Sequence, residues 1–134
     1  MRSVVFDSFA ILAWFNAEPG ARLTKALLAD LKDGRRRGGI CAVNLGEVYY
    51  TMRRRHGPER ADELHRFLLA LPWEVIPATN ELVWAAARLK GTHLISYADA
   101  FALACAQQRD ASLVTGDPEL HAAPHGVEVL WETE

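Results

Sequence analysis

Short apolar runs of β-type residues alternate along the chain with longer segments of helical periodicity, and this alternation constrains the fold more than any other feature. Each apolar run ends at residues that favour a helix start or a turn. Strands that alternate with helices form a mostly parallel sheet with helices on both faces. We therefore predict an α/β fold around a central, mostly parallel sheet.

The predicted elements fit one domain, residues 1–134, because domains of this size bury a single core and neither a repeat nor a linker interrupts the sequence. Strands are expected at residues 3–6, 40–43, 73–78, 112–115 and 127–131. Helices are expected at residues 9–15, 21–32, 44–56, 59–70, 80–90 and 96–109, with a short helical segment after residue 117.

Composition narrows the cellular setting. The longest apolar stretches, such as residues 9–15, fall well short of the roughly 20 residues that span a bilayer. No signal sequence opens the chain, so we expect a cytoplasmic protein without membrane contact. Cys41 and Cys105 lack metal-ligand spacing and are expected to be buried thiols in a reducing compartment.

The net charge of −2 argues against a protein that binds nucleic acid through its overall electrostatic field. The charge is nevertheless uneven, because residues 35–37 and 53–55 are runs of three arginines. Such runs are usually solvated surface, but they can also contact phosphates. The run at 53–55 lies at the far end of the predicted helix that begins near Glu47, so it can flank a substrate groove if that helix borders one.

Four acidic residues stand near strand ends or helix starts. Asp7 follows the first strand, and Glu47 stands near the start of the helix after the second strand. Asp99 begins a long helix, and Asp117 follows a later strand. Because the carboxyl ends of parallel strands meet at one edge, we expect all four acids to face that edge, where α/β proteins bind ligands.

Taken singly, each acid is also explained as part of a helix cap. The patterns Asn44-x-x-Glu47 and Ser96-x-x-Asp99 match a capping box, and Asp7 and Asp117 stand where an N-cap belongs. Four carboxylates at one edge also need a positive charge to offset their repulsion, because like charges about 5 Å apart repel by roughly 3 kcal/mol per pair at an effective dielectric of about 20. Capping and binding of a cation are compatible.

A hard divalent cation is the natural partner for such carboxylates. Mg²⁺ prefers oxygen ligands and retained waters, and in this setting it supports hydrolysis of phosphodiesters. A zinc site is not predicted, because there is no His-Glu-x-x-His pattern and Pro124 interrupts the pair His121 and His125.

Four segments in order resemble the motifs of PIN-domain proteins, and most of all VapC-like toxins: Val-Val-Phe-Asp-Ser at 4–8, Asn-Leu-Gly-Glu-Val-Tyr-Tyr at 44–50, Ser-Tyr-Ala-Asp-Ala at 96–100 and Thr-Gly-Asp at 115–117. The resemblance covers essentially the whole chain. It implies a single PIN-like domain and an endoribonuclease that depends on Mg²⁺ or Mn²⁺. The acidic site then maps to Asp7, Glu47, Asp99 and Asp117, with Thr115 as the hydroxyl residue before the last acid.

The resemblance also suggests separate roles for these residues. Asp7 and Asp99 are expected to be the principal metal ligands, and Glu47 a further ligand or the group that orients the attacking water. Asp117 is expected to act directly or through a water, and Thr115 to hold a metal-bound water or a carboxylate.

One position departs from the family pattern. Many relatives carry a small polar residue two positions after the first Asp, where this chain has Phe9, and it has Ser8 directly after Asp7. A contribution of Ser8 to the site is therefore left open.

Partners are implied by the same resemblance. They are an RNA substrate, tRNA or rRNA, a VapB-like antitoxin whose tail brings a basic side chain into the acidic site, and a second copy of the chain in a homodimer. Trp14, Phe15, Tyr49 and Tyr50 can offer apolar surface to a partner, although such residues are more often buried in a core.

Three alternatives remain at this stage. A phosphoacceptor receiver domain needs two acids after one strand and a Lys after a late strand, and neither is visible. A non-enzymatic PIN-like module that binds RNA or protein is favoured only if one of the four acids is replaced. A nuclease for DNA or for RNA processing has the same site, and an adjacent antitoxin reading frame would distinguish it from a toxin.

Overall fold

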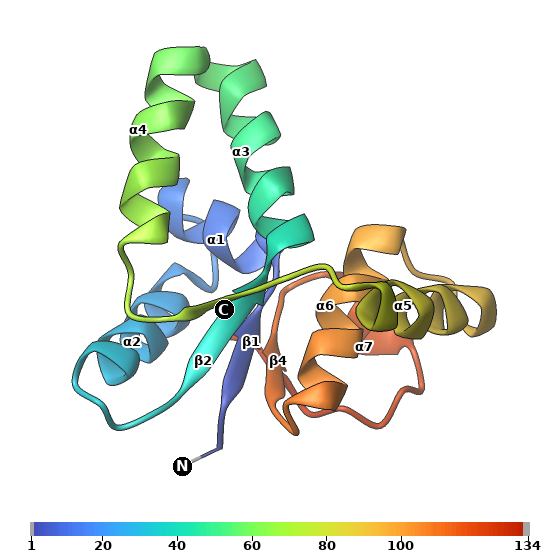
Figure 1. The fold of residues 1–134 in the computed structure, drawn as a ribbon. Coiled ribbons are helices and arrows are strands. Elements are labelled where there is room, and N and C mark those ends of the chain that lie inside the picture. Colours follow the sequence, from blue (N-terminus) through green and yellow to red (C-terminus); the bar gives the residue numbers. More distant parts are fainter. Residues whose placement is uncertain (1, 133–134) are drawn as a thin grey trace.

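The structure is a computed structural model that describes residues 2–132, within which five strands and seven helices alternate (Figure 1). The strands are β1 (Val4–Phe6), β2 (Gly38–Cys41), β3 (Glu74–Ile76), β4 (Ser112–Val114) and β5 (Val129–Leu130). The helices are α1 (Ser8–Phe15), α2 (Ala21–Lys32), α3 (Ala42–His56), α4 (Pro58–Leu69), α5 (Asn80–Thr92), α6 (Tyr97–Gln108) and α7 (Pro118–Ala122). The predicted α/β fold is confirmed.

The described strands form one parallel sheet in the order β3-β2-β1-β4-β5. The chain builds outward from β1 to β2 and β3, and then returns to place β4 on the other side of β1. The order therefore reverses between β1 and β4. In open α/β sheets the crevice at the carboxyl ends of two such strands is where ligands bind.

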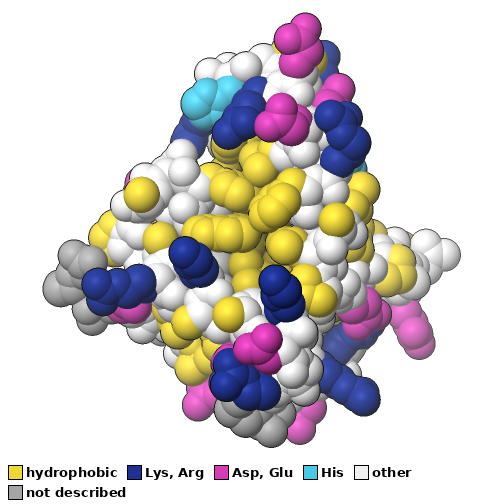
Figure 2. Space-filling view, turned by 90° about the vertical axis from the view of Figure 1, so that its left-hand side faces the viewer, with side chains coloured by type: hydrophobic (Ala, Val, Ile, Leu, Met, Phe, Trp, Pro, Cys, Tyr) yellow, Lys and Arg dark blue, Asp and Glu magenta, His cyan; other side chains and the backbone are white. Residues whose placement is uncertain are grey.

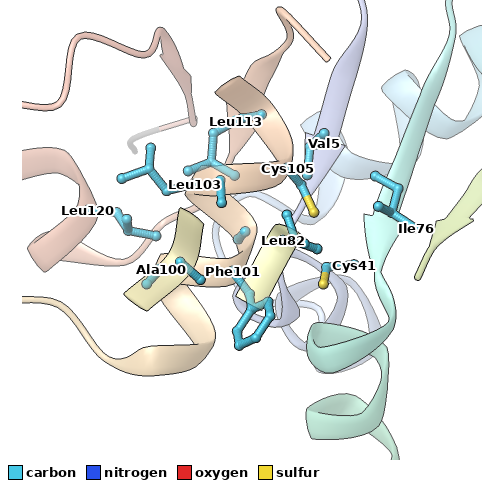
Figure 3. Close-up of a cluster of buried hydrophobic side chains, with 14 of the residues drawn as sticks. Val5, Cys41, Ile76, Leu82, Ala100, Phe101, Leu103, Cys105, Leu113 and Leu120 are labelled. Carbon is cyan, nitrogen blue, oxygen red and sulfur yellow. The ribbon is translucent and has the colours of Figure 1, made fainter. Parts of the chain in front are cut away.

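Helices cover both faces of the sheet, and each face has its own core. Alternate side chains of a strand point to opposite faces, so Val5 belongs to one cluster while Val4 and Phe6 belong to the other. Helices α5, α6 and α7 close the first cluster, part of which Figure 3 shows. Helices α1, α2, α3 and α4 close the second, and α3 and α4 rise above the sheet as an antiparallel pair (Figure 1).

The second strand begins earlier than predicted, because Gly38 and Gly39 belong to β2 rather than to the loop before it. A Cβ on Gly39 would lie 2.5 Å from the carbonyl oxygen of Glu74, and one on Gly38 would lie 2.8 Å from that of Val4. The glycines therefore allow the neighbouring strands to approach. Helix α3 in turn begins at Ala42, two residues earlier than expected.

The other strands are shorter at their ends than predicted. The segment expected at 73–78 is regular only over Glu74–Ile76, and the segment expected at 127–131 only over Val129–Leu130. Both are edge strands with one neighbour, so fewer ladder hydrogen bonds hold their ends.

Two further observations concern the chain as a whole. In residues 2–132 no helix combines the length and apolar character that crossing a membrane requires. Cys41 and Cys105 are free, fully buried thiols in the cluster beneath α6, as predicted.

Candidate active site

Asp7 and Asp117 flank the point where the strand order reverses. Asp7 follows the last residue of β1, and Thr115, Gly116 and Asp117 follow β4, its neighbour. The amide of Asp7 donates a hydrogen bond to the carbonyl oxygen of Val114 over 3.3 Å, so the two strand ends are joined where the acids begin. The predicted sheet edge is thus where these residues lie.

Asp7 is a buried acid whose two carboxylate oxygens differ in their contacts. Its Oδ1 accepts a hydrogen bond from the amide of Ala10 over 3.0 Å and so caps α1. Its side chain is 1% exposed, and among the described residues Oδ2 has no hydrogen-bond partner. Burial raises the pKa of Asp7 from 3.8 to about 7, which the Thr115 hydroxyl and the Ala10 amide oppose and the carboxylates of Asp117 and Glu47 reinforce.

Thr115 and Asp117 form a tight turn at the end of β4. The fully buried hydroxyl of Thr115 accepts a hydrogen bond from the amide of Asp117 over 3.0 Å. Asp117 Oδ1 accepts one from the amide of Glu119 over 2.9 Å, so Asp117 is the N-cap of α7, with Pro118 in its first turn as expected. Thr115 therefore fixes the backbone that carries Asp117, besides lying close enough to affect Asp7.

Asp99 reaches the same edge from α6. The hydroxyl of Ser96 accepts a hydrogen bond from the amide of Asp99 over 3.1 Å, which confirms Ser96 as the N-cap. Asp99 is almost fully buried. Burial, the nearby Asp117 side chain and the Asp7 carboxylate together raise its pKa to about 8, and the Ser96 hydroxyl opposes this shift.

Glu47 lies in the second turn of α3 rather than at its start, so the predicted capping box at Asn44 and Glu47 is wrong. The N-cap is Cys41, which makes no side-chain capping bond. Asn44 instead lies inside the helix, fully buried, and its Nδ2 donates a hydrogen bond to the carbonyl oxygen of Ala98 over 3.0 Å. That bond joins α3 to the start of α6, next to Asp99.

Ser8 is the residue whose role the sequence left open, and it holds Glu47. Its hydroxyl donates a hydrogen bond to Oε1 of Glu47 over 2.6 Å. The bond connects the start of α1 with α3 and leaves Oε2 of Glu47 available. The only sequence signal was the position of Ser8 beside Asp7, because a contact across 39 residues leaves no spacing pattern.

The four acids are thus neighbours without surrounding a common point. The carboxylates of Glu47 and Asp117 raise the pKa of Asp7, and those of Asp117 and Asp7 raise the pKa of Asp99. Yet within residues 2–132 no group of three or more His, Cys, Asp or Glu side chains could hold a metal ion in the arrangement seen. Two of the acids, Asp7 and Asp117, each have one carboxylate oxygen bonded to a backbone amide.

The side chains of the three arginines at 53–55 point in three different directions. Arg53 donates a hydrogen bond to the hydroxyl of Tyr49, and Arg54 lies over the ring of Tyr50. Arg55 lines a cavity of about 260 Å³ together with Phe9 of α1. Because successive residues of a helix point about 100° apart, these arginines do not form one basic patch.

Comparison with known proteins adds the family and the fold. A family profile described as "PIN domain" matches residues 4–126. No curated protein matches the sequence.

Three solved structures with the same fold are distant from this chain in sequence. VapBC2 from Rickettsia felis bound to a DNA fragment from their promoter has a TM-score of 0.73 at 18% identity, with 96% of this chain and 97% of that chain covered. VapC20 from Mycobacterium tuberculosis, described as a "Sarcin-Ricin loop cleaving toxin", has a TM-score of 0.72 at 21% identity, with 90% and 95% covered. A toxin-antitoxin complex from Klebsiella pneumoniae has a TM-score of 0.67 at 19% identity, with 98% of each chain covered.

Proposed function

This chain belongs to the PIN-domain family, and on that premise we propose that it is a metal-dependent endoribonuclease, the cytoplasmic toxin of a VapBC-type toxin-antitoxin pair. The observation that carries the proposal is the buried carboxyl of Asp7 beside Glu47 and Asp117 at the carboxyl edge of the sheet, whose Oδ2 has no hydrogen-bond partner within residues 2–132. A buried charge without a partner is unfavourable, and a cation at this position would offset it.

The donor set fits a hard divalent cation, Mg²⁺ or Mn²⁺. All four acids offer oxygen, and no described Cys or His is gathered with them into a group of three or more that could hold a metal. Asp7 and Asp99 would be the principal ligands, because burial keeps the pKa of both well above the ordinary range until a positive charge arrives. Asp117 would contribute directly or through a water. When bound, such an ion lowers the pKa of an attacking water and offsets charge on the cleaved phosphate.

The remaining residues orient groups around that position. Glu47, held through Oε1 by Ser8, keeps Oε2 available to bind and orient the attacking water. Thr115 fixes Asp117 through its backbone amide. A water held by a carboxylate of defined orientation is positioned for attack on a phosphodiester, which is the reaction we assign.

RNA is the proposed substrate, with tRNA or rRNA as its source. The acids alone do not distinguish RNA from DNA, because both present the same phosphodiester. RNA is favoured by the kinship of the fold, since a structural relative is described as cleaving the sarcin-ricin loop. A nuclease for DNA or for RNA processing is the second candidate, and the experiment below separates the two.

The antitoxin has a candidate surface on the side of α2 and α4. Figure 2 shows hydrophobic side chains gathered in the middle of this face, with charged side chains around them. Trp14 stacks on Phe15 with ring centroids 5.0 Å apart and approaches Phe67 at 6.0 Å, and Phe67 stays half exposed. An exposed apolar patch with a charged rim is typical of a protein interface. We assign it to a VapB-like antitoxin; homodimerisation stays a prediction that light scattering can test.

The decisive experiment uses protein purified without antitoxin and shown to be folded. A mixed tRNA and rRNA pool, and DNA of matched length, are incubated with Mg²⁺, Mn²⁺ or EDTA. We expect metal-dependent cuts in RNA only, and a loss of roughly a thousandfold in rate for Asp7→Asn, because removing a metal ligand removes several kcal/mol of transition-state stabilisation.

The matched control is Asp110→Asn, at the opposite end of the sheet, where the side chain is 98% exposed and pairs with Arg2. Its backbone φ of 48° suits Asn as well as Asp. Full activity of Asp7→Asn, or no cleavage of either nucleic acid with any metal, would refute the proposed function.

A further inference from the structure

Exposed aromatic rings stand next to the acids of the site. Phe9 follows Asp7 by two residues, Tyr50 follows Glu47 by three, and Tyr97 precedes Asp99 by two, and all three side chains are more than two fifths exposed. Phe9 packs edge-on against Trp131 with ring centroids 5.6 Å apart, and Tyr97 lies against Phe101 at 5.0 Å, so packing accounts for these two rings.

Tyr50 differs from the other two rings because a cation lies over it. The guanidinium carbon of Arg54 is 4.9 Å from the centroid of the Tyr50 ring. Glu47, Tyr50 and Arg54 follow one another at spacings of three and four, which places them on one face of α3. With about 100° and 1.5 Å per residue, Arg54 returns to within about 20° of Glu47 and lies roughly 10 Å further along the helix.

The neighbouring arginines are engaged elsewhere. Arg53 donates to the hydroxyl of Tyr49, which in turn donates to Asp62 on α4. Arg55 faces the cavity beside α1. Along the face that starts at Glu47, the order is therefore a carboxylate, an aromatic ring and a guanidinium.

We propose that Tyr50 and Arg54 form a stacking platform that holds an unpaired base of the RNA next to the cut phosphate. This inference rests on the proposed function. Unpaired bases stack on aromatic rings and on guanidinium planes, whereas bases inside a duplex are already stacked. The net charge of −2 and the acids of the site repel an RNA backbone, so local contacts have to supply affinity.

The test measures binding apart from cleavage. Full-length protein in EDTA is titrated with a fluorescent single-stranded RNA of mixed sequence and with its duplex form. We expect Tyr50→Ala to weaken single-strand binding about tenfold or more, and Tyr50→Phe to bind like wild type because the ring is kept. Arg54→Ala should weaken binding and reduce the slope of log K against log salt by about 0.7, as for one phosphate contact. Trp84→Ala, which removes a 60% exposed ring from α5, should change neither quantity.

Each result separates the two proposals. Loss of single-strand affinity in Tyr50→Ala but not in Tyr50→Phe supports the platform. If wild type cuts RNA and Tyr50→Ala binds and cuts equally well, the platform is refuted and the nuclease stands. The same holds if Tyr50→Ala changes only the oligomeric state, or if wild type prefers the duplex. A folded wild type that neither binds nor cuts any RNA refutes both.

Discussion

The two faces of the sheet are built from different residues. Beneath α6 the core is rich in small side chains, among them Ala100, Ala102, Ala104 and Ala106, and α6 is buried from Asp99 to Ala106. On the other face the core contains leucines and large rings; Trp14 there is only partly buried, and Phe67, which lies beside it, is half exposed. Small residues let a helix pack closely on a sheet, whereas the larger side chains of the other face extend to the surface, where a partner can contact them.

The candidate site lies at the junction of these two halves. Asp99 comes from the alanine-rich half and Glu47 from the aromatic half, while Asp7 directly follows β1, the strand that both halves share. On the proposed function, the closed half would hold Asp99 as a metal ligand, and the open half would present surface for RNA and the antitoxin. The following predictions test that difference, from the largest expected effect to the smallest.

Truncating a large side chain should be most costly in the aromatic half. Leu68 of α4 is 1% exposed and packs in that core, so Leu68→Ala should lower the free energy of unfolding by about 2 to 5 kcal/mol. Leu69→Ala is the matched control, because Leu69 is the next residue of α4 and is 51% exposed. Urea denaturation measures both variants, and equal losses would contradict the assignment of this core.

The site should make stability depend on pH when no metal is bound. Folding raises the pKa of Asp7 from 3.8 to about 7, so the folded chain holds this proton more tightly than the unfolded chain does. The stabilisation is complete below about pH 4 and is lost as the pH rises to about 7. We expect unfolding free energy in EDTA to fall by a few kcal/mol over this range.

Asp99, whose pKa is raised to about 8, acts in the same direction and extends the fall to slightly higher pH. Asp7→Asn should flatten the profile, and added Mg²⁺ should restore stability of the wild type at pH 7 to 8. Parallel profiles for wild type and Asp7→Asn would show that the Asp7 carboxyl is not the source of the pH dependence.

Enlarging a small side chain should be most costly in the alanine-rich half. Ala102 of α6 is fully buried, and Ala102→Leu should lower the free energy of unfolding by about 1 to 3 kcal/mol through overpacking. Ala87→Leu adds the same atoms at an exposed position of α5 and should be nearly neutral. Thermal unfolding compares the two; a neutral Ala102→Leu would mean that the space beneath α6 is looser than it appears.

Removing the link between the halves should have the smallest effect on stability. Asn44→Ala deletes the hydrogen bond to the carbonyl oxygen of Ala98, and at a buried site this should lower the free energy of unfolding by about 1 to 3 kcal/mol. We expect a loss near the lower end, because the substitution also removes Oδ1 of Asn44, which lacks a partner among the described residues. We expect a larger relative loss in cleavage rate, since Asp99 is positioned by the same segment. Unchanged cleavage would show that Asp99 needs no support from α3.

Much of this architecture was predictable from the sequence, because the signals were local. Apolar runs followed by capping residues predicted the strands and the starts of α1, α6 and α7, and Asp7, Ser96 and Asp117 do cap these helices. The start of α3 was not predictable in this way. Its cap, Cys41, makes no side-chain bond, while Asn44, which matches a capping residue, is engaged by Ala98 from another part of the chain.

In the candidate site, too, some features follow from local sequence signals and others do not. The placement of Asp7 and Asp117 at one sheet edge follows from the strand-end rule, but the hydrogen bond from Ser8 to Glu47 and the three directions of Arg53, Arg54 and Arg55 come from tertiary packing. The metal, the roles of the acids and the RNA remain predictions that the experiments above address.

The capping bond at Asp7 has an evolutionary consequence. It requires an oxygen at Oδ1, which asparagine supplies as well as aspartate does. Codons for the two amino acids differ by one base, so on the proposed function a single mutation at residue 7 silences the enzyme and leaves α1 intact. On the same proposal, a lineage can keep a folded but inactive copy, and such a copy would compete with active toxins for the antitoxin.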